Sequence, residues 1–193
     1  MAQYSQTERL QQNNSDLAII ALTDQNSLAT LFDRFFPLVH KYVFYRVGDL
    51  TMADDLTSEV FERMLSALST FKPEKAPFGA WLFGIARHVI NDHHRSQKRK
   101  REFSSEEMDR LIAPEPQPEE ASLIVEADLS LLTALKKLSN REKDIIGLKF
   151  AANLTNRQIA KLTGLGESHI GVILFRSIKR LRLFLNYMEE KDE

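Results

Sequence analysis

Basic side chains gather at one end of a long predicted helix, directly after a cluster of aromatic residues. Five of the seven residues from Arg95 to Arg101 are Arg or Lys, and Phe71, Phe78 and Trp81 precede them. Cations neutralise phosphates, and stacking on an aromatic ring contributes roughly 1–3 kcal/mol for each base of a single strand. The pattern therefore fits a surface for unpaired nucleic acid. It also fits core aromatic rings beside a solvated helix end.

A second pattern, near the C-terminus, predicts two helices joined by a tight turn. Thr155 and Gln158 form a capping box that starts the first helix, and Gly164 suits the positive φ that ends it. The second helix is expected from about Glu167, and cations such as Arg176 follow along it. A helix-turn-helix with a basic second helix places that helix in the DNA major groove. The alternative is an αα-hairpin that only packs within the protein.

A third pattern is the acidic face of the helix expected at residues 51–69. Leu56, Val60 and Met64 have core spacing, and Phe61 lies off this apolar stripe. The charged residues on the rest of the helix are Asp54, Asp55, Glu59, Glu62 and Arg63. An acidic face with an exposed ring suits docking to another protein. An ordinary solvated face is the alternative.

These side chains require helices to position them. Apolar residues recur at intervals of three and four, which predicts an all-α protein. The first part of the chain should hold a short helix and then long helices at about residues 27–47, 51–69 and 78–100. Leu65 and Leu68 are expected on the inward face of the second long helix. Gly84, inside the third, indicates close helix packing, because a mid-helix glycine costs about 1 kcal/mol relative to alanine.

An acidic, proline-rich segment divides the chain. Prolines at every second position from Pro114 to Pro118 remove backbone donors and disfavour helix, so we expect an extended linker. Ser104 and Glu107 could cap a short helix before it. The expected divisions are a polar, flexible start at residues 1–15, a helical unit at 16–101, an acidic linker at 102–121, a four-helix unit at 122–188 and a tail at 189–193. We also expect the two small helical domains to be separable by proteolysis within the linker.

Composition excludes several classes of function. The 193 residues include no cysteine, which removes disulfides, thiolate metal ligands and cysteine nucleophiles. The sequence has no apolar run as long as a membrane span, and its polar N-terminus is not a signal peptide. It contains no glycine-rich phosphate loop or nucleophile elbow, and the adjacent His93 and His94 cannot form an i, i+4 metal pair. We therefore expect a protein that is not an enzyme and uses no metal or cofactor.

Charge is unevenly distributed along the chain, although the formal net charge is only −1. Residues 102–128 hold nine acidic residues and one basic residue, whereas residues 27–101 and 129–193 hold twelve basic residues each. Two basic blocks around an acidic segment suggest a polyanionic partner for the blocks. Solvated helix faces would give the same counts.

Taken in order, these segments resemble a bacterial RNA polymerase sigma factor of the extracytoplasmic-function (ECF) type, over roughly residues 16–186. Residues Ala53–Phe61 resemble the family segment that docks on the clamp helices of core polymerase. Residues Phe71–Arg87 resemble the loop and helix that open the downstream promoter element. Residues Leu135–Leu183 resemble the domain that binds the upstream element, although Gly171–Ile173 replaces a Lys-Ser-Arg sequence that is frequent in the family.

The resemblance implies three groups of site residues and no catalytic or metal site. They are Asp54, Asp55, Leu56, Glu59, Val60, Phe61, Arg63 and Met64 for core polymerase; Phe71, Lys72, Phe78, Trp81, Arg87, His88, Asn91, His94, Arg95, Lys98 and Arg99 for the downstream element; and Thr155, Asn156, Arg157, Glu167, Ser168, His169, Val172, Arg176, Lys179 and Arg180 for the upstream element.

The resulting interpretation is an alternative sigma factor that directs core RNA polymerase to specific promoters, as duplex DNA and as opened single strand. The resemblance also implies an anti-sigma factor as partner and a bacterial cytoplasmic location, with any attachment to the membrane made through that partner. One alternative is a helix-turn-helix regulator that does not bind polymerase, but it leaves the acidic helix and the aromatic loop unexplained. Another is a sigma mimic that sequesters an anti-sigma partner.

Overall fold

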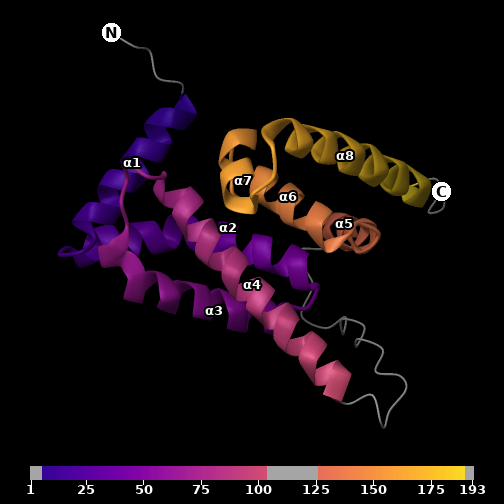
Figure 1. Ribbon diagram of the computed structural model, residues 1–193, viewed down its shortest axis with the longest axis horizontal. Helices are drawn as coiled ribbons and strands as arrows, with labels where there is room; N and C mark the ends of the chain where they lie inside the picture. Colours follow the sequence, from indigo (N-terminus) through magenta and orange to yellow (C-terminus); the bar gives the residue numbers. More distant parts are fainter. Residues whose placement is uncertain (1–5, 104–125, 190–193) are drawn as a thin grey trace.

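The computed structural model describes residues 6–103 and 126–189, and these ranges contain helices, turns and loops but no strand. The fold is therefore all-α, as predicted. The first unit consists of α1 (Gln6–Ile20), α2 (Gln25–Val47), α3 (Leu50–Ala67), a 3-10 turn (Leu68–Thr70) and α4 (Phe78–Phe103), and the second of α5 (Glu126–Lys136), α6 (Asn140–Phe150), α7 (Asn156–Thr163) and α8 (Glu167–Glu189) (Figure 1).

Short polar signals set the helix ends of the first unit. The Asp24 carboxylate accepts from the backbone N–H of Ser27 at 2.7 Å and caps α2. Gly48 ends α2 with φ of 76°, which a residue without Cβ adopts readily. Asp49 then caps α3 by accepting from the N–H of Met52 at 2.7 Å. This tight connection returns α3 alongside α2.

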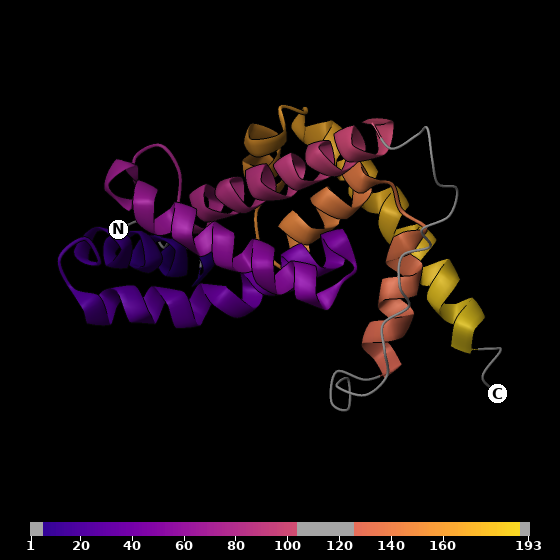
Figure 2. The same ribbon diagram turned by 90° about the horizontal axis from the view of Figure 1, so that it is seen from below.

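Both predicted capping boxes are present in the second unit. Ser139 with Glu142 starts α6, and Thr155 with Gln158 starts α7, with both reciprocal hydrogen bonds formed in each pair. Gly164 ends α7 with φ of 74°, as the turn of the helix-turn-helix requires. Helices α5 and α8 lie side by side and share a small core of Ala134, Leu135, Leu138 and Leu181 (Figure 2).

The N-terminal helix begins earlier than the sequence indicates. Residues 6–15 were expected to be flexible because they are polar, but they form the first part of α1. Tertiary hydrogen bonds explain the difference. The Arg34 guanidinium donates to the side-chain oxygen of Asn13 at 2.8 Å, and the buried Ser15 hydroxyl accepts from the backbone N–H of Phe78 at 3.1 Å.

One continuous core joins the two units. Fully buried side chains such as Tyr42 and Phe83 belong to the same cluster as Ile145, Leu148 and Ile159. Helix α6 lies against α2, and α7 lies against α4. The units are therefore docked in this structure, whereas the linker sequence alone predicts two units that proteolysis would separate.

Gly84 lies at the contact between the two units. A Cβ at that position would lie 3.4 Å from Cδ2 of Leu162, on α7 of the other unit, which is an ordinary van der Waals contact. The glycine faces a helix of the second unit, but the packing there does not exclude an alanine. The acidic linker and the Ser104–Glu107 cap fall outside the described residues. In the described ranges, no helix combines the length and apolar character that a membrane span needs.

Candidate nucleic-acid and docking surfaces

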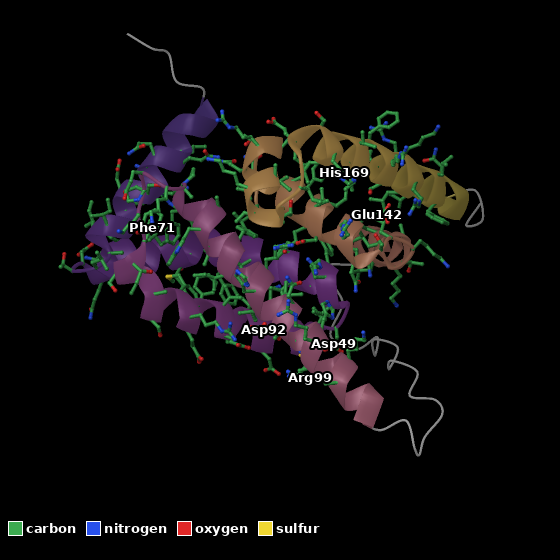
Figure 3. All side chains as sticks on the ribbon, viewed as in Figure 1. Asp49, Phe71, Asp92, Arg99, Glu142 and His169 are labelled. Carbon is green, nitrogen blue, oxygen red and sulfur yellow. The ribbon has the colours of Figure 1, made fainter. Side chains whose placement is uncertain are left out.

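The C-terminal part of α4 presents the cations predicted to contact DNA. Arg95, Lys98 and Arg99 are exposed and, with Asp92, line an open hollow of about 410 Å³. Spacings of three and four residues place these cations on one side of the helix. Figure 3 shows Arg99 on the stretch of α4 that extends past the neighbouring helices, and Asp92 nearer to them. This surface is accessible to a polyanion.

The aromatic rings before α4 are less accessible than predicted. Phe78 is fully buried and Phe71 is 9% exposed, because their rings pack edge to face with centroids 5.5 Å apart. Phe35 covers Phe78 from α2, with centroids 5.1 Å apart. Neither phenylalanine can receive a base in this conformation, so their predicted stacking role is not possible in it. Trp81, which is partly exposed and packs on Phe71, is the accessible ring of the three.

The other predicted downstream residues divide into two sets. Lys72 and His88 are exposed, and Asn91 is partly exposed. Arg87 instead faces the second unit, where its Nε donates to Asp144 at 2.8 Å. His94 is half-buried; burial and the nearby charges of Arg46, His93 and Lys143 lower its pKa. The surface predicted to contact the downstream element is therefore exposed mainly along the C-terminal part of α4.

Helix α3 keeps the predicted acidic face but buries its predicted ring. Phe61 is 5% exposed, because its ring packs against Phe32 of α2 with centroids 4.7 Å apart. The exposure expected for Phe61 is therefore wrong. The other predicted docking residues that lie in the core are Leu56, Val60 and Met64. Direct docking through these four side chains is not possible without rearrangement.

Charged residues of α3 remain on the surface, and several have partners within the chain. The Asp54 carboxylate lies 2.8 Å from Nε2 of His40, and Arg63 pairs with Glu59 at 2.6 Å. Arg63 also pairs with Asp92 at 3.3 Å, which connects α3 to the cationic part of α4. Asp55 is exposed, and the contacts of the described residues give it no ion pair.

Sequence reasoning missed an exposed apolar edge beside this acidic face. Phe32 is 42% exposed, and Leu65, which was expected to point inward, is 51% exposed. Leu65 lies one turn beyond Phe61 on α3, and Phe32 also stacks on Phe36 with centroids 5.0 Å apart. We call Phe32, Phe36 and Leu65 the aromatic edge. The four-residue spacing of Phe32 and Phe36 was the available signal.

The helix-turn-helix presents the predicted face of α8. Ile170, Leu174 and Leu181 pack inward. The predicted residues that are exposed on α8 are Glu167, Ser168, His169, Val172, Arg176, Lys179 and Arg180. Thr155 and Arg157 are exposed on the preceding helix and turn, and Asn156 is partly exposed.

Two features of α8 were not predicted. Arg180 pairs with Glu142 of α6 at 3.1 Å, so part of its charge is neutralised within the unit. Phe175, which sequence reasoning left unassigned, is 70% exposed on the same side as Val172.

His169 and Arg99 lie toward opposite sides of the molecule in Figure 3.

Among the described residues, no group of three or more His, Cys, Asp or Glu side chains is arranged to hold a metal ion. The surfaces described above are one cationic helix, one exposed helix-turn-helix and one acidic helix with an apolar edge.

Comparison with known proteins identifies the family that combines these surfaces. The family described as Sigma-70 region 2 matches residues 31–100, and Sigma-70, region 4 matches residues 134–183. The ECF RNA polymerase sigma factor BldN of Streptomyces coelicolor is 32% identical over 162 residues, which cover 84% of this chain and 61% of BldN. The ECF sigma factor SigD of Mycobacterium tuberculosis is 26% identical over 82% of this chain and 77% of SigD.

Solved structures show the same fold. The sigma factor RpoE of Bartonella quintana, in complex with the anti-sigma factor NepR, matches with a TM-score of 0.67 and 19% identity, over 82% of this chain and 96% of RpoE. CnrH, in complex with the cytosolic domain of CnrY, matches with a TM-score of 0.65 and 20% identity, over 90% of this chain and 97% of CnrH.

The two matched regions and their order make this chain a member of the sigma-70 family of RNA polymerase sigma factors. Within that family it belongs to the ECF type, as its curated relatives do. The chain is thus an alternative sigma factor.

Proposed function

We propose that this chain directs core RNA polymerase to a specific set of promoters and helps to open the DNA there. The observation that carries this proposal is the presence, in one chain, of an exposed helix-turn-helix and a separate cationic helix end. A regulator that reads only duplex DNA has a use for the first surface but not for the second. In this proposal the two surfaces act together in opening a promoter: the helix-turn-helix contacts paired DNA, and the cationic end of α4 contacts DNA that has opened.

Core polymerase binds the acidic face of α3 in this proposal. Asp55 supplies an exposed carboxylate, and Asp54 supplies a second one beside His40. The aromatic edge supplies the apolar contact that we had assigned to Phe61, because Phe32 and Leu65 are exposed next to it. Charges at such an interface give specificity and association rate, and exposed aromatic residues are typical sites of strong binding.

Promoter DNA binds on two sides of the molecule. The exposed face of α8, from Glu167 to Arg180, meets the upstream element as a duplex. The outer part of α4, with Asn91, Arg95 and Lys98, meets the opened downstream element. Unstacking bases costs a few kcal/mol, and phosphate contacts together with stacking on an exposed ring such as Trp81 offset that cost.

An anti-sigma factor is the further partner in this proposal, since the structurally similar RpoE is complexed with the anti-sigma factor NepR. We place the chain in the bacterial cytoplasm, where polymerase and DNA are found, and a membrane-bound anti-sigma factor would hold it at the membrane. It acts by binding and has no catalytic activity of its own.

Open-complex formation tests the proposal most directly. We expect Asn91→Ala, Arg95→Ala and Lys98→Ala to reduce permanganate reactivity of unpaired thymines on a duplex promoter with core polymerase. The loss of activity caused by the same variants should be smaller on a template that is already mismatched across the downstream element, because the protein does not have to open that DNA. Lys41→Ala removes an exposed cation from α2 and serves as the matched control.

Three results would contradict the proposal. Equal losses on duplex and mismatched templates would limit α4 to binding. Promoter binding without reactive thymines, on any promoter selected from genomic DNA, would favour the regulator that does not bind polymerase. Capture of an anti-sigma factor with no binding to core polymerase would favour the sigma mimic.

A further inference from the structure

The helices of the two units meet at one buried carboxylate. Asp144, on α6, is 5% exposed. Its Oδ1 accepts from the Tyr42 hydroxyl at 2.7 Å and lies 2.6 Å from Nη1 of Arg46, and both residues belong to α2. Its Oδ2 accepts from Nε of Arg87, on α4, at 2.8 Å. We call these four residues the Asp144 cluster.

The side-chain partners of this carboxylate all come from the other unit. Tyr42 is fully buried and Arg46 is 5% exposed, so water cannot readily replace either contact while the units are docked. Burial and the negative charge of Asp144 raise the pKa of Tyr42, which keeps the hydroxyl protonated as a donor. Arg87 also donates to the backbone carbonyl of Leu162 at 3.1 Å and so attaches α4 to α7.

The packing beside the cluster depends on a glycine. A Cβ at Gly147 of α6 would lie 2.5 Å from Cδ2 of the Tyr42 ring, a distance that real Cβ atoms essentially never show. The ring cannot move away easily, since it also packs edge to face on Phe83 with centroids 5.4 Å apart. Glycine at position 147 is therefore required for α6 to approach α2 this closely.

The docked arrangement occupies residues that we assign to DNA. Two donors of Arg87 are used within the protein, by Asp144 and by Leu162. His94 is half-buried beside Arg46 and Lys143, and its Nε2 is buried with no hydrogen-bond partner among the described residues. Both side chains are therefore only partly available for the proposed DNA contact while the units stay docked.

We propose that the Asp144 cluster is an autoinhibitory contact: it holds the free chain closed, and it must open before α4 and α8 engage a promoter together. Buried charges remain stable only with their partners, so removing the carboxylate should leave Arg46 unpaired and favour opening. A closed majority lowers apparent affinity in proportion to the open fraction. The inhibitory consequence rests on the proposed function, whereas closure itself does not.

Interdomain distance in the full chain tests closure. The chain contains no cysteine, so spin labels can be attached specifically to Ser69→Cys in the first unit and Asn186→Cys on α8, both exposed positions. Pulsed EPR should give one narrow distance distribution for this labelled chain. Adding Asp144→Asn or Gly147→Ala should give longer and broader distributions. A narrow distribution for either variant, or a broad one without them, would overturn the proposal.

Gly171→Ala is the matched control for these measurements. Its Cβ would lie 3.9 Å from Nδ2 of Asn156, an ordinary contact within the second unit, so the distance distribution should not change. Gly147→Ala also protects the test against simple unfolding, because alanine has a higher helix propensity than glycine in α6. Helical content measured by circular dichroism should be unchanged in both glycine variants.

Binding of the chain to promoter DNA that is mismatched across the downstream element tests inhibition. We expect Asp144→Asn and Gly147→Ala to bind this DNA about three- to tenfold more tightly than the unsubstituted chain, since both raise the open fraction. Variants that open without binding the promoter more tightly would overturn the inhibitory role. If the unsubstituted chain and both opened variants bind no promoter DNA even with core polymerase present, the proposed function fails, and the EPR result still decides closure independently.

Discussion

Single aromatic residues carry different roles in this chain, and their neighbours decide which. Phe61 and Phe32 have the same side chain, but α3 turns Phe61 into the core while Phe32 stays 42% exposed at its edge. Truncation of a buried phenylalanine leaves a cavity, whereas truncation of an exposed one mainly removes contact area available to a partner. The two positions therefore separate stability from docking.

We predict that Phe61→Ala lowers the free energy of unfolding by about 3–5 kcal/mol, which is the usual cost for a buried phenylalanine. Phe32→Ala should cost less than half of that, and it should still weaken binding to core polymerase. Urea denaturation and a polymerase pull-down of the two folded variants measure the two effects. Equal destabilisation by both changes, or full polymerase binding by Phe32→Ala, would contradict the assignment of the aromatic edge.

At the scale of helices, the sequence predicts local features well. The capping boxes at Ser139 and Thr155 and the turn at Gly164 are confirmed, because each depends on residues within four positions along the chain. The start of α1 could not be predicted in this way. The contacts that hold α1 against the rest of the unit, such as the hydrogen bond from Phe78 to Ser15, join residues 63 positions apart.

The candidate surfaces also combine features that can be predicted from local sequence with features that depend on long-range packing. Exposure along α8 and the outer part of α4 follows from helical periodicity, and the structure agrees with it. The inward position of Phe61 and the occupation of Arg87 by Asp144 depend on which helices pack together. Periodicity gives the side of a helix that is apolar, but it does not give the neighbour that covers a borderline position.

The stability of the docked form should depend on pH, because His94 is half-buried among charged groups from three helices. Burial first, then Arg46 of α2, His93 of α4 and Lys143 of α6, lower the pKa of His94 below its ordinary value of about 6.5. The docked form therefore binds a proton less readily than the open or unfolded form. Its stability is fully present above about pH 6.5 and decreases as the pH falls below that value toward the lowered pKa.

We predict that acidification from pH 7.5 to about 5.5 lowers the thermal unfolding midpoint more in the unsubstituted chain than in His94→Gln, which cannot take up this proton. His88→Gln removes an exposed histidine from the same helix and is the control. A pH profile of His94→Gln that matches the unsubstituted chain would show that another group dominates the effect.

At the scale of the whole molecule, the units are joined by sequence and by packing. The proline-rich sequence between them predicts a protease-sensitive backbone. The shared core, with Tyr42 and Phe83 on one side and Leu148 and Ile159 on the other, predicts that cutting the backbone does not release the units. Proteolysis and separation are therefore two different events in this chain.

We predict that limited proteolysis cuts once within residues 102–120 and that the two fragments then elute together from a size-exclusion column. The same digestion of Asp144→Asn should give fragments that elute separately, because the interface loses its central charge. Mass spectrometry of the eluted peaks identifies the cut. Separate elution of the fragments without the substitution would show that the docked arrangement is too weak to outlast the covalent connection.

The contact between Gly147 and Tyr42 limits how this protein can be recombined with its relatives. The design of a chimaera that exchanges promoter-binding domains assumes that each domain can be replaced without changing the other. Here a donor domain with any larger residue at position 147 would meet the Tyr42 ring and could not dock as this one does. Such a chimaera would be constitutively open unless position 42 were changed with it, so the two positions have to be exchanged as a pair.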